Sequence, residues 1–381
     1  MVMSGGKQTV AIYGGGIGGG LLAKRLMADF DVTLVDPLDY FEVPMSAPRS
    51  LVFPDFANAA TFAFAEALPG VTHIGARLEE WTEKGGIVRH DVAATSVVHA
   101  DISVLATGST YANPLMRAFN GTMAERKAFY RRFHERLTGS RHILIVGGGP
   151  IGVEVAGEIS ETFPHKQLTL IEAGPRILGG TSAKAAAHAA RVLAKRGVTI
   201  LTGEKLLDGM PADDIWAPGG EVRTTAGRTI AHDLVIWCVG GRPNTGYMRQ
   251  QFANLLDANG RIRVDPNLRV RGESRLFALG DITDLDENKM AWHVGGQVEV
   301  AEANIRAVAA GQAPAKSYRP RTGDPRMAIT LGSRAGVVHM PGLGVVRAGW
   351  LVRAAKAAHM LVPRYRKEFD LSKEKVLSPP G

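Results

Sequence analysis

The chain has 381 residues, of which 45% are hydrophobic and 22% charged, and its formal net charge is +8. This length is enough for two or three domains with complete cores. No apolar run approaches the roughly 18 residues of a membrane span, and residues 1–7 lack the apolar core of a secretory signal. We therefore expect a cytoplasmic protein.

The cysteine and histidine residues indicate which redox and metal sites can be excluded. The single cysteine, Cys238, excludes an intramolecular disulfide. It lies in the apolar run 234–239, which is typical of a small buried hydrophobe rather than of a redox thiol. No group of Cys and His residues has the spacing of metal ligands, so we expect no metal site.

Residues 10–36 have the order of a dinucleotide-binding unit. The apolar run Val10–Tyr13 predicts a strand, a helix is expected over 21–28, and a second strand ends on Asp36. Four glycines shape the loop between the first strand and the helix: Gly14, Gly16, Gly18 and Gly19. In the spacing Gly-x-Gly-x-x-Gly the glycines permit the tight turn, the approach of a pyrophosphate and close helix packing. The pyrophosphate would lie at the helix N-terminus, and Asp36 would accept hydrogen bonds from a ribose.

The chain between the first unit and residue 137 contains three further features. Alternating residues with turn signals over 71–105 predict a small antiparallel meander. It ends on the tripeptide Ala106, Thr107 and Gly108, and a helix is expected over 122–137.

A second unit of the same kind begins 133 residues after the first. A strand over 142–146 is followed by a loop and helix start that contain Gly147, Gly149, Ile151 and Gly152. A helix over 153–162 and a strand ending on Glu172 complete the unit, so we predict a second bound dinucleotide. Because a carboxylate repels a 2′-phosphate, Glu172 favours NADH over NADPH, whereas the nearby Arg176 keeps NADPH open as the alternative.

The last 66 residues are basic. Between residues 316 and 381 there are 13 Lys and Arg against 4 Asp and Glu. Such a surplus suggests an anionic membrane, nucleic acid or acidic protein as partner, with a solvated basic face as the alternative. We expect a basic helix over 345–361, in which Trp350, Leu351 and Leu361 would be the apolar anchors of an interfacial helix. A packed C-terminal helix is the competing interpretation.

Together, the two glycine fingerprints, the 106–108 tripeptide, residues 240–244 (Gly-Gly-Arg-Pro-Asn) and the Gly280–Asp281 pair resemble the two-dinucleotide-binding flavoproteins. The likeness is strongest to the apoptosis-inducing factor 2 or ferroptosis suppressor branch, with type II NADH dehydrogenases as neighbours. Shorter signs of that branch are these: Leu105–Thr110, Val146–Glu154 with Ala156, Glu158 and Ile159, and Lys289–Ala291. The absence of cysteines from residues 44–49 excludes the redox-active pair of the flavin disulfide reductases.

This resemblance implies an α/β fold with two Rossmann-like (βαβ) domains, the second nested in the first, and a small C-terminal α+β region. The expected parts are an FAD-binding domain over 1–115 and 246–315, an NAD(P)H-binding domain over 116–245, and the basic region 316–381. In the resembling proteins, Gly240, Gly280 and Asp281 belong to the cofactor sites, with Asp281 bonded to the ribityl chain of FAD.

The implied activity passes electrons from NADH through FAD to a quinone at a membrane surface. The alternatives are an NADH-dependent reductase of a ferredoxin- or rubredoxin-like protein and a redox-sensing nucleic-acid binder. Few aromatic residues are placed for base stacking, so we expect no nucleic-acid partner. Position 2 is Val rather than the glycine that is myristoylated in animal members of the branch, so the resemblance does not carry lipid attachment over.

Three residues are candidates for catalysis. The resemblance places Glu154 beside the flavin and nicotinamide; the alternative is a helix-start acid stabilised by the dipole. His293, with Gln297, flanks the same region and is a candidate for an acceptor pocket, or is structural. Lys356 aligns with a tail lysine of the ferroptosis suppressor branch that is thought to lie near the active site, and a solvated helix lysine is the alternative.

Overall fold

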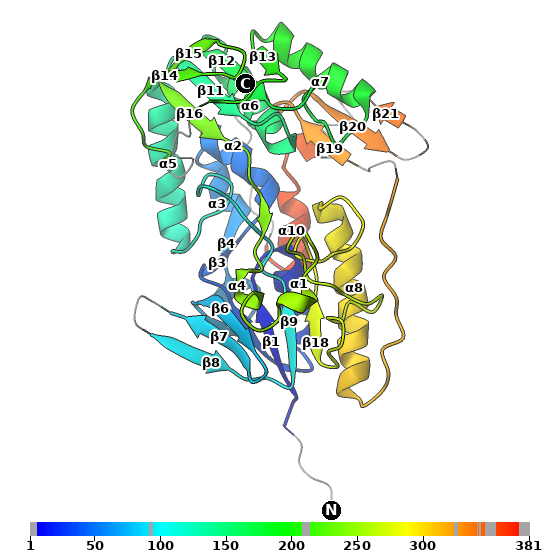
Figure 1. The fold of residues 1–381 in the computed structure, drawn as a ribbon. Coiled ribbons are helices and arrows are strands. Elements are labelled where there is room, and N and C mark those ends of the chain that lie inside the picture. Colours follow the sequence, from blue (N-terminus) through cyan, green and yellow to red (C-terminus); the bar gives the residue numbers. More distant parts are fainter. Residues whose placement is uncertain are drawn as a thin grey trace, which may run out of the picture.

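The computed structural model describes residues 6–90, 94–207, 214–323, 327–340, 342, 344–346 and 356–372. Two parallel sheets lie toward opposite ends of an elongated molecule, as Figure 1 shows, and short strands and helices connect them. This is the α/β architecture that the two glycine fingerprints predict.

The first sheet has five parallel strands. Their spatial order is β18 (Leu276–Ala278), β9 (Ile102–Leu105), β1 (Thr9–Tyr13), β2 (Asp31–Val35) and β5 (Thr72–Ile74). The last four residues of β1 are fully buried, as expected for a central parallel strand covered on both faces. Helices α1 (Ile17–Leu26) and α8 (Ala291–Ala309) pack against each other and contribute to the same hydrophobic core. Because β18 follows the second sheet in sequence, the second unit is inserted into the first.

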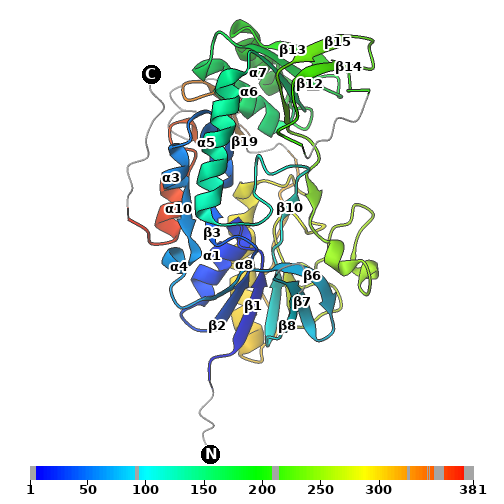
Figure 2. The same ribbon diagram turned by 90° about the vertical axis from the view of Figure 1, so that its left-hand side faces the viewer.

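Smaller elements surround this sheet. The antiparallel meander consists of β6 (Arg77–Thr82), β7 (Gly85–Arg89) and β8 (Thr95–Val98). On the other side lie β3 (Tyr40–Glu42), α2 (Ala47–Val52), α3 (Phe56–Ala60), β4 (Thr61–Ala63) and α4 (Phe64–Ala67). Helix α2 packs against both α5 (Met123–Gly139) and α6 (Pro150–Thr162), and so joins the first unit to the second. Figure 2 shows α5 along the side of the molecule between the two sheets.

The second sheet has four parallel strands. Their spatial order is β13 (Thr199–Thr202), β12 (Gln167–Glu172), β11 (His142–Val146) and β16 (Leu234–Trp237). Helices α6 and α7 (Ala183–Lys195) belong to this unit, as does the hairpin of β14 (Gly220–Arg223) and β15 (Thr229–His232). The two-residue strands β10 (Ser109–Thr110) and β17 (Arg242–Pro243) pair antiparallel where the chain passes between the units.

After α8 the chain runs extended along the molecule to a third sheet (Figure 1). This sheet is antiparallel and consists of β19 (Met327–Thr330), β20 (Gly336–Met340) and β21 (Gly344–Val346). Strand β19 packs on α6 and β20 on α7. The short helix α10 (Val362–Glu368) returns to the first unit, where Tyr365 and Phe369 pack on Phe41.

The predicted helix over 345–361 is wrong at both ends. Val345 pairs with His339 as part of β21, and Leu361, with a φ of +63°, precedes α10 in a left-handed conformation that cannot continue a helix. Trp350 and Leu351 lie outside the described residues.

Candidate functional site

The two glycine fingerprints form equivalent turns. Gly14 and Gly147 have φ values of +107° and +105°, a region that favours glycine. A Cβ atom on Gly19 would lie 1.8 Å from the carbonyl oxygen of Gly14, and one on Gly152 would lie 1.9 Å from that of Gly147. The backbone packing therefore requires glycine at the third position of each fingerprint.

The middle glycines lie instead beside open space. Gly16 and Gly149 are the N-caps of α1 and α6, and neither helix receives a hydrogen bond from a capping side chain. A Cβ on Gly149 would have no atom within 4 Å, and one on Gly16 would meet only the Arg117 side chain at 3.6 Å. Both helices thus have uncapped N–H groups with room in front of them, which fits a pyrophosphate.

An acid closes each unit in the same way. Asp36 accepts from the N–H of Gly15 at 2.6 Å and from that of Leu38 at 2.9 Å. Glu172 accepts from the N–H of Gly148 at 2.6 Å and from the N–H of Gly174 at 2.7 Å. Each carboxylate therefore orients the glycine loop of its own unit. The predicted ribose contacts of Asp36 and Glu172 remain predictions.

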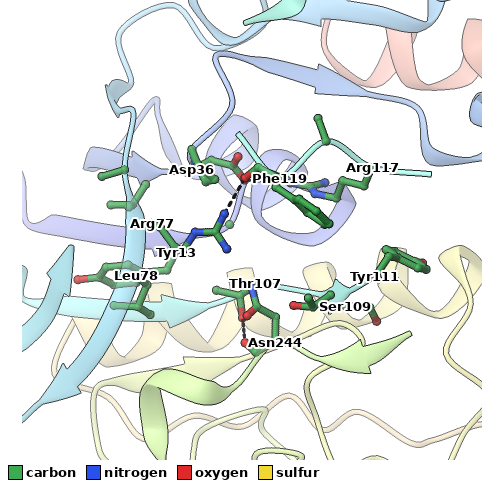
Figure 3. Close-up of a pocket in the computed structure, with 16 residues that line it drawn as sticks. Tyr13, Asp36, Arg77, Leu78, Thr107, Ser109, Tyr111, Arg117, Phe119 and Asn244 are labelled. Carbon is green, nitrogen blue, oxygen red and sulfur yellow. Dashed lines mark hydrogen bonds and ion pairs between the residues drawn. The ribbon is translucent and has the colours of Figure 1, made fainter. Parts of the chain in front are cut away.

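Two adjoining pockets extend from the first glycine loop. The first, of about 640 Å³, contains Asp36 and Asn244 in its wall (Figure 3). The second, of about 1150 Å³, lies between the starts of α1 and α6. Four residues line both pockets: Thr107, Ser109, Tyr111 and Arg117. Together the two pockets form an extended cavity, which fits an elongated dinucleotide bound with its pyrophosphate at α1.

The second pocket gathers residues that are far apart in the sequence. Predicted site residues in its wall are Gly16, Gly18, Ala106, Thr107, Gly108, Ile151, Glu154, Gly280 and Asp281. Asp281 accepts a hydrogen bond of 2.8 Å from the Ser109 hydroxyl. Apolar side chains of Met45, Pro48 and Met116 complete the wall. Gly240 is not part of this wall; it has a φ of +91° in the turn that follows β16.

Glu154 and Lys356 form a buried ion pair at this pocket. Lys356 Nζ lies 2.5 Å from Glu154 Oε1, and the two side chains are 10% and 7% exposed. The same oxygen accepts from the backbone N–H of Thr330 at 3.0 Å and from its hydroxyl at 3.1 Å. Glu154 lines the pocket, whereas Lys356 lies behind it. The structure therefore brings together two of the three predicted catalytic residues.

The third, His293, does not line either pocket. Its Nδ1 lies 3.1 Å from a carboxylate oxygen of Glu287, whose side chain is fully buried. Gln297 donates to Glu287 at 2.8 Å and accepts from the N–H of Gly280 at 2.6 Å. His293 is thus linked through Glu287 and Gln297 to the Gly280 turn, and its catalytic role remains a prediction.

Some pocket residues were missed by the motif analysis. Arg117 donates to Asp36 at 3.1 Å, but it lies in a loop that matches no motif. Burial raises the pKa of the Tyr111 hydroxyl, and the charge of Asp281 raises it further. Lys289, which belongs to a family motif, lines the second pocket, and its pKa is lowered mainly by burial and by the nearby Arg261.

Arg176 has a local role in the second unit. Its Nη2 donates to the carbonyl oxygens of Gly179 and Thr181 at 2.9 and 2.8 Å. The guanidinium thus holds the loop that follows β12.

Three further properties bear on function: the state of the cysteine, the metal-binding groups and the length and apolarity of the helices. Burial raises the pKa of the Cys238 thiol to about 12, so the reactive thiolate is scarce near neutral pH. Within the described ranges, no group of three or more His, Cys, Asp or Glu residues is arranged to hold a metal ion. Of the helices in the part of the chain that the structure describes, none combines the length and apolarity needed to cross a bilayer.

The extended cavity and the second glycine turn define a two-dinucleotide-binding oxidoreductase fold. The chain belongs to the pyridine nucleotide-disulphide oxidoreductase family, whose model matches residues 8–304. Members of this family typically carry FAD and use NADH or NADPH. Although the family is described by disulphide chemistry, these 381 residues contain one cysteine.

Individual relatives cover nearly the whole chain. Ferroptosis suppressor protein 1 of Mus musculus is 30% identical over 363 residues, with 94% of each chain covered. The structure of NDH2 from Plasmodium falciparum in complex with NADH has a TM-score of 0.66 at 14% identity and covers 95% of this chain and 98% of that one. The sulfide:quinone oxidoreductase of Aquifex aeolicus has a TM-score of 0.70 at 15% identity and covers 94% and 90%. The two solved structures show a shared fold, and the resemblance predicted from the motifs is confirmed.

Proposed function

We propose that this chain oxidises NADH and reduces a quinone, with FAD bound at the first glycine turn. The observation that carries this proposal is the second pocket, whose wall contains residues from the starts of both nucleotide helices, Gly16–Gly18 at α1 and Ile151 and Glu154 of α6. Groups bound at the two helix starts therefore face one pocket. FAD held at the first glycine turn would supply the redox chemistry, namely hydride acceptance from NADH and electron transfer to an acceptor.

The lining of this pocket supports a flat, apolar acceptor. Met45, Pro48 and Met116 present apolar surface in the pocket wall, which suits a flat apolar ring, whereas Asp281 is the residue expected to bind the ribityl chain of FAD. A quinone ring has this chemistry. The sulfide:quinone oxidoreductase with the same fold adds support by its named substrate.

Quinone reduction also requires a proton. One NADH, one proton and one quinone give NAD⁺ and one quinol, so one proton is taken up from solution. Glu154 and Asp281 are the two carboxylates in the pocket wall, and we propose that Glu154, which Lys356 contacts, relays this proton. Lys356 acts through Glu154, because it contacts the carboxylate from behind the pocket wall. His293 lies beside Glu287, with its Nδ1 3.1 Å from a carboxylate oxygen, and its catalytic role stays a prediction.

NADH is proposed over NADPH because Glu172 carries a negative charge at the end of β12. Arg176 keeps its positive charge, and its Nη2 donates to carbonyl oxygens of its own loop. Its buried Nη1 makes no hydrogen bond among the described residues, which keeps NADPH as the alternative. A 2′-phosphate would meet the carboxylate.

A peripheral membrane location is proposed from the surface near α8. Trp292 is 42% exposed and follows Ala291, a residue of the pocket wall. Arg364 of α10 lies 5.9 Å from the centre of its ring. An exposed tryptophan beside an arginine suits an anionic bilayer surface, which would bring the pocket close to a lipid-dissolved acceptor. Flotation with vesicles of anionic phosphatidylserine, but not with neutral vesicles, is the expected result.

The test is anaerobic mixing of the purified yellow protein with NADH, followed by a short-chain ubiquinone. Bleaching of the flavin band and rapid reoxidation by quinone are expected. Glu154→Gln should slow the reoxidation by roughly 100-fold, in the range of a lost general acid, while bleaching by NADH persists. Glu161→Gln, a matched change on the same helix away from the pocket, should leave both steps unchanged. A colourless protein, or bleaching that quinone does not reverse, would contradict the proposal, and the latter would favour a protein acceptor.

A further inference from the structure

Arg49 is the largest fully buried side chain among the described residues. It belongs to α2, and a guanidinium remains charged in proteins, so its burial needs a partner. That partner is Glu158 of α6, whose side chain is 2% exposed. Arg49 Nη2 lies 2.8 Å from Glu158 Oε1, and Nε lies 3.2 Å from Oε2. This two-point geometry fixes α2 of the first unit against α6 of the second.

The remaining nitrogen of Arg49 points to the C-terminal segment. Nη1 donates to the carbonyl oxygen of Ala357 at 2.6 Å and to that of Ala358 at 3.2 Å. These residues directly follow Lys356 in the chain. Arg49 therefore binds the backbone that carries the lysine of the Glu154 pair.

Two glutamates of α6 hold the Lys356 segment, one through the lysine side chain and one through Arg49. Glu154 and Glu158 are four residues apart, so they lie on one face of the helix. Glu154 binds the Lys356 side chain, and Glu158 binds the arginine that holds the backbone after Lys356. A lysine side chain loses rotamer entropy when it is fixed, and anchoring the backbone that carries Lys356 reduces the number of positions open to its amine.

We propose that Arg49, together with Glu158, is a positioning residue that fixes Lys356 on Glu154. It contacts α6 and the 357–358 backbone but does not line either pocket. Its effect on turnover rests on the proposed function of Glu154, whereas its effect on Lys356 does not. Arg49→Lys keeps a positive charge but cannot bind both Glu158 oxygens and both carbonyls, so Lys356 becomes less ordered.

The direct test measures the reactivity of the Lys356 amine in the FAD-loaded protein. Brief labelling with acetic anhydride, followed by peptide mass spectrometry, should show Lys356 labelled at least about fivefold faster in Arg49→Lys and in Glu158→Gln than in the unchanged protein. Arg366→Lys is the matched control. This buried arginine of α10 donates to the carbonyls of Ser372 and Ala59, and its variant should leave the labelling of Lys356 unchanged. Equal labelling in all four proteins would overturn the proposal.

Kinetics supply the second readout. Arg49→Lys should lower kcat for quinone about tenfold, with little change in KM and with flavin reduction by NADH retained. In a Lys356→Met background the same change should have no further effect, because residues acting through one contact are not additive. An undiminished second effect would contradict the positioning role. If the unchanged protein does not reduce quinone, the proposed function fails, and the labelling still decides the role of Arg49.

Discussion

Arg117 and Asp36 form an ion pair with 3.1 Å between Nη2 and Oδ2, which joins the loop before α5 to the end of β2. The Asp36 side chain is 2% exposed and that of Arg117 is 34% exposed. Asp36 already accepts two backbone N–H groups, so the arginine is not needed to satisfy it. Since Arg117 lines both pockets, it is placed to meet an anionic cofactor between them.

Replacing Arg117 by Met should weaken FAD retention. A hydrogen bond to a charged group contributes about 1.5–3 kcal/mol, so the dissociation constant is expected to rise roughly 10- to 100-fold. The measurement is flavin fluorescence during titration of the apoprotein. Arg131→Gln, at an exposed position of α5, should bind FAD normally. Unchanged affinity in the Arg117 variant would mean that this arginine serves only Asp36.

The second fingerprint allows folding and binding to be separated by two alanine substitutions. Gly152→Ala places a Cβ 1.9 Å from a backbone oxygen, and such overpacking should cost about 3 kcal/mol of unfolding free energy. Gly149→Ala meets no atom within 4 Å, so its stability should be unchanged. Its methyl group nevertheless enters the space in front of α6, and NADH binding should weaken at least about tenfold. Thermal unfolding and NADH titration distinguish the two effects, and normal NADH binding by Gly149→Ala would argue against a pyrophosphate at α6.

Stability in acid should depend on two aspartates that precede equivalent strands. Backbone N–H groups of His142 and Arg141 lower the pKa of Asp233, and those of Thr9 with its hydroxyl lower the pKa of Asp101. A pKa lowered by folding stabilises the native state above the unfolded value of about 3.9, and this stabilisation is lost as the pH falls through the folded pKa.

The midpoint temperature of thermal unfolding should therefore decrease as the pH is lowered from 5 to 3. This decrease should be less steep in Asp233→Asn than in the unchanged protein. Asp55→Asn changes an exposed carboxylate at the N-cap of α3, where the side chain makes no capping hydrogen bond, and this variant should follow the original curve. Circular dichroism during heating at each pH gives the midpoints. Identical slopes for the Asp233 variant and the original protein would show that these hydrogen bonds do not couple folding to pH.

The sequence was informative where function requires a local pattern. Gly14, Gly19 and Asp36 are close in the chain, and backbone geometry alone dictates their spacing, so the first unit could be predicted down to individual residues. Gly147 and Glu172 repeat that logic. The family likeness proposed Glu154 and Lys356 separately as site residues, but their ion pair was not predicted, because 202 residues separate them and no local spacing links them.

Long-range contacts without a motif were out of reach. Arg117 comes from an irregular loop, and Arg49 finds Glu158 only after the two units pack. One signal for Arg49 does exist, namely a charged residue in the otherwise uncharged stretch 43–54. The helix expected over 345–361 failed because its apolar spacing fits a helix, while the pairing of β21 with β20 and the left-handed Leu361 prevail in the folded chain.

The choice of nicotinamide cofactor should depend on Glu172. Glu172→Gln retains an oxygen that can accept from Gly148 or Gly174 but removes the charge that repels a 2′-phosphate. The ratio of kcat/KM for NADPH to that for NADH should rise about tenfold, mainly through a lower KM for NADPH, because the repulsion acts on binding. Flavin reduction measured with each cofactor gives both values. Glu161→Gln changes the net charge equally on the neighbouring helix and should leave the ratio unchanged. A carboxylate in contact with the adenosine ribose must affect the binding of a 2′-phosphate. If Glu172→Gln also leaves the ratio unchanged, the adenosine ribose therefore does not bind at the end of β12.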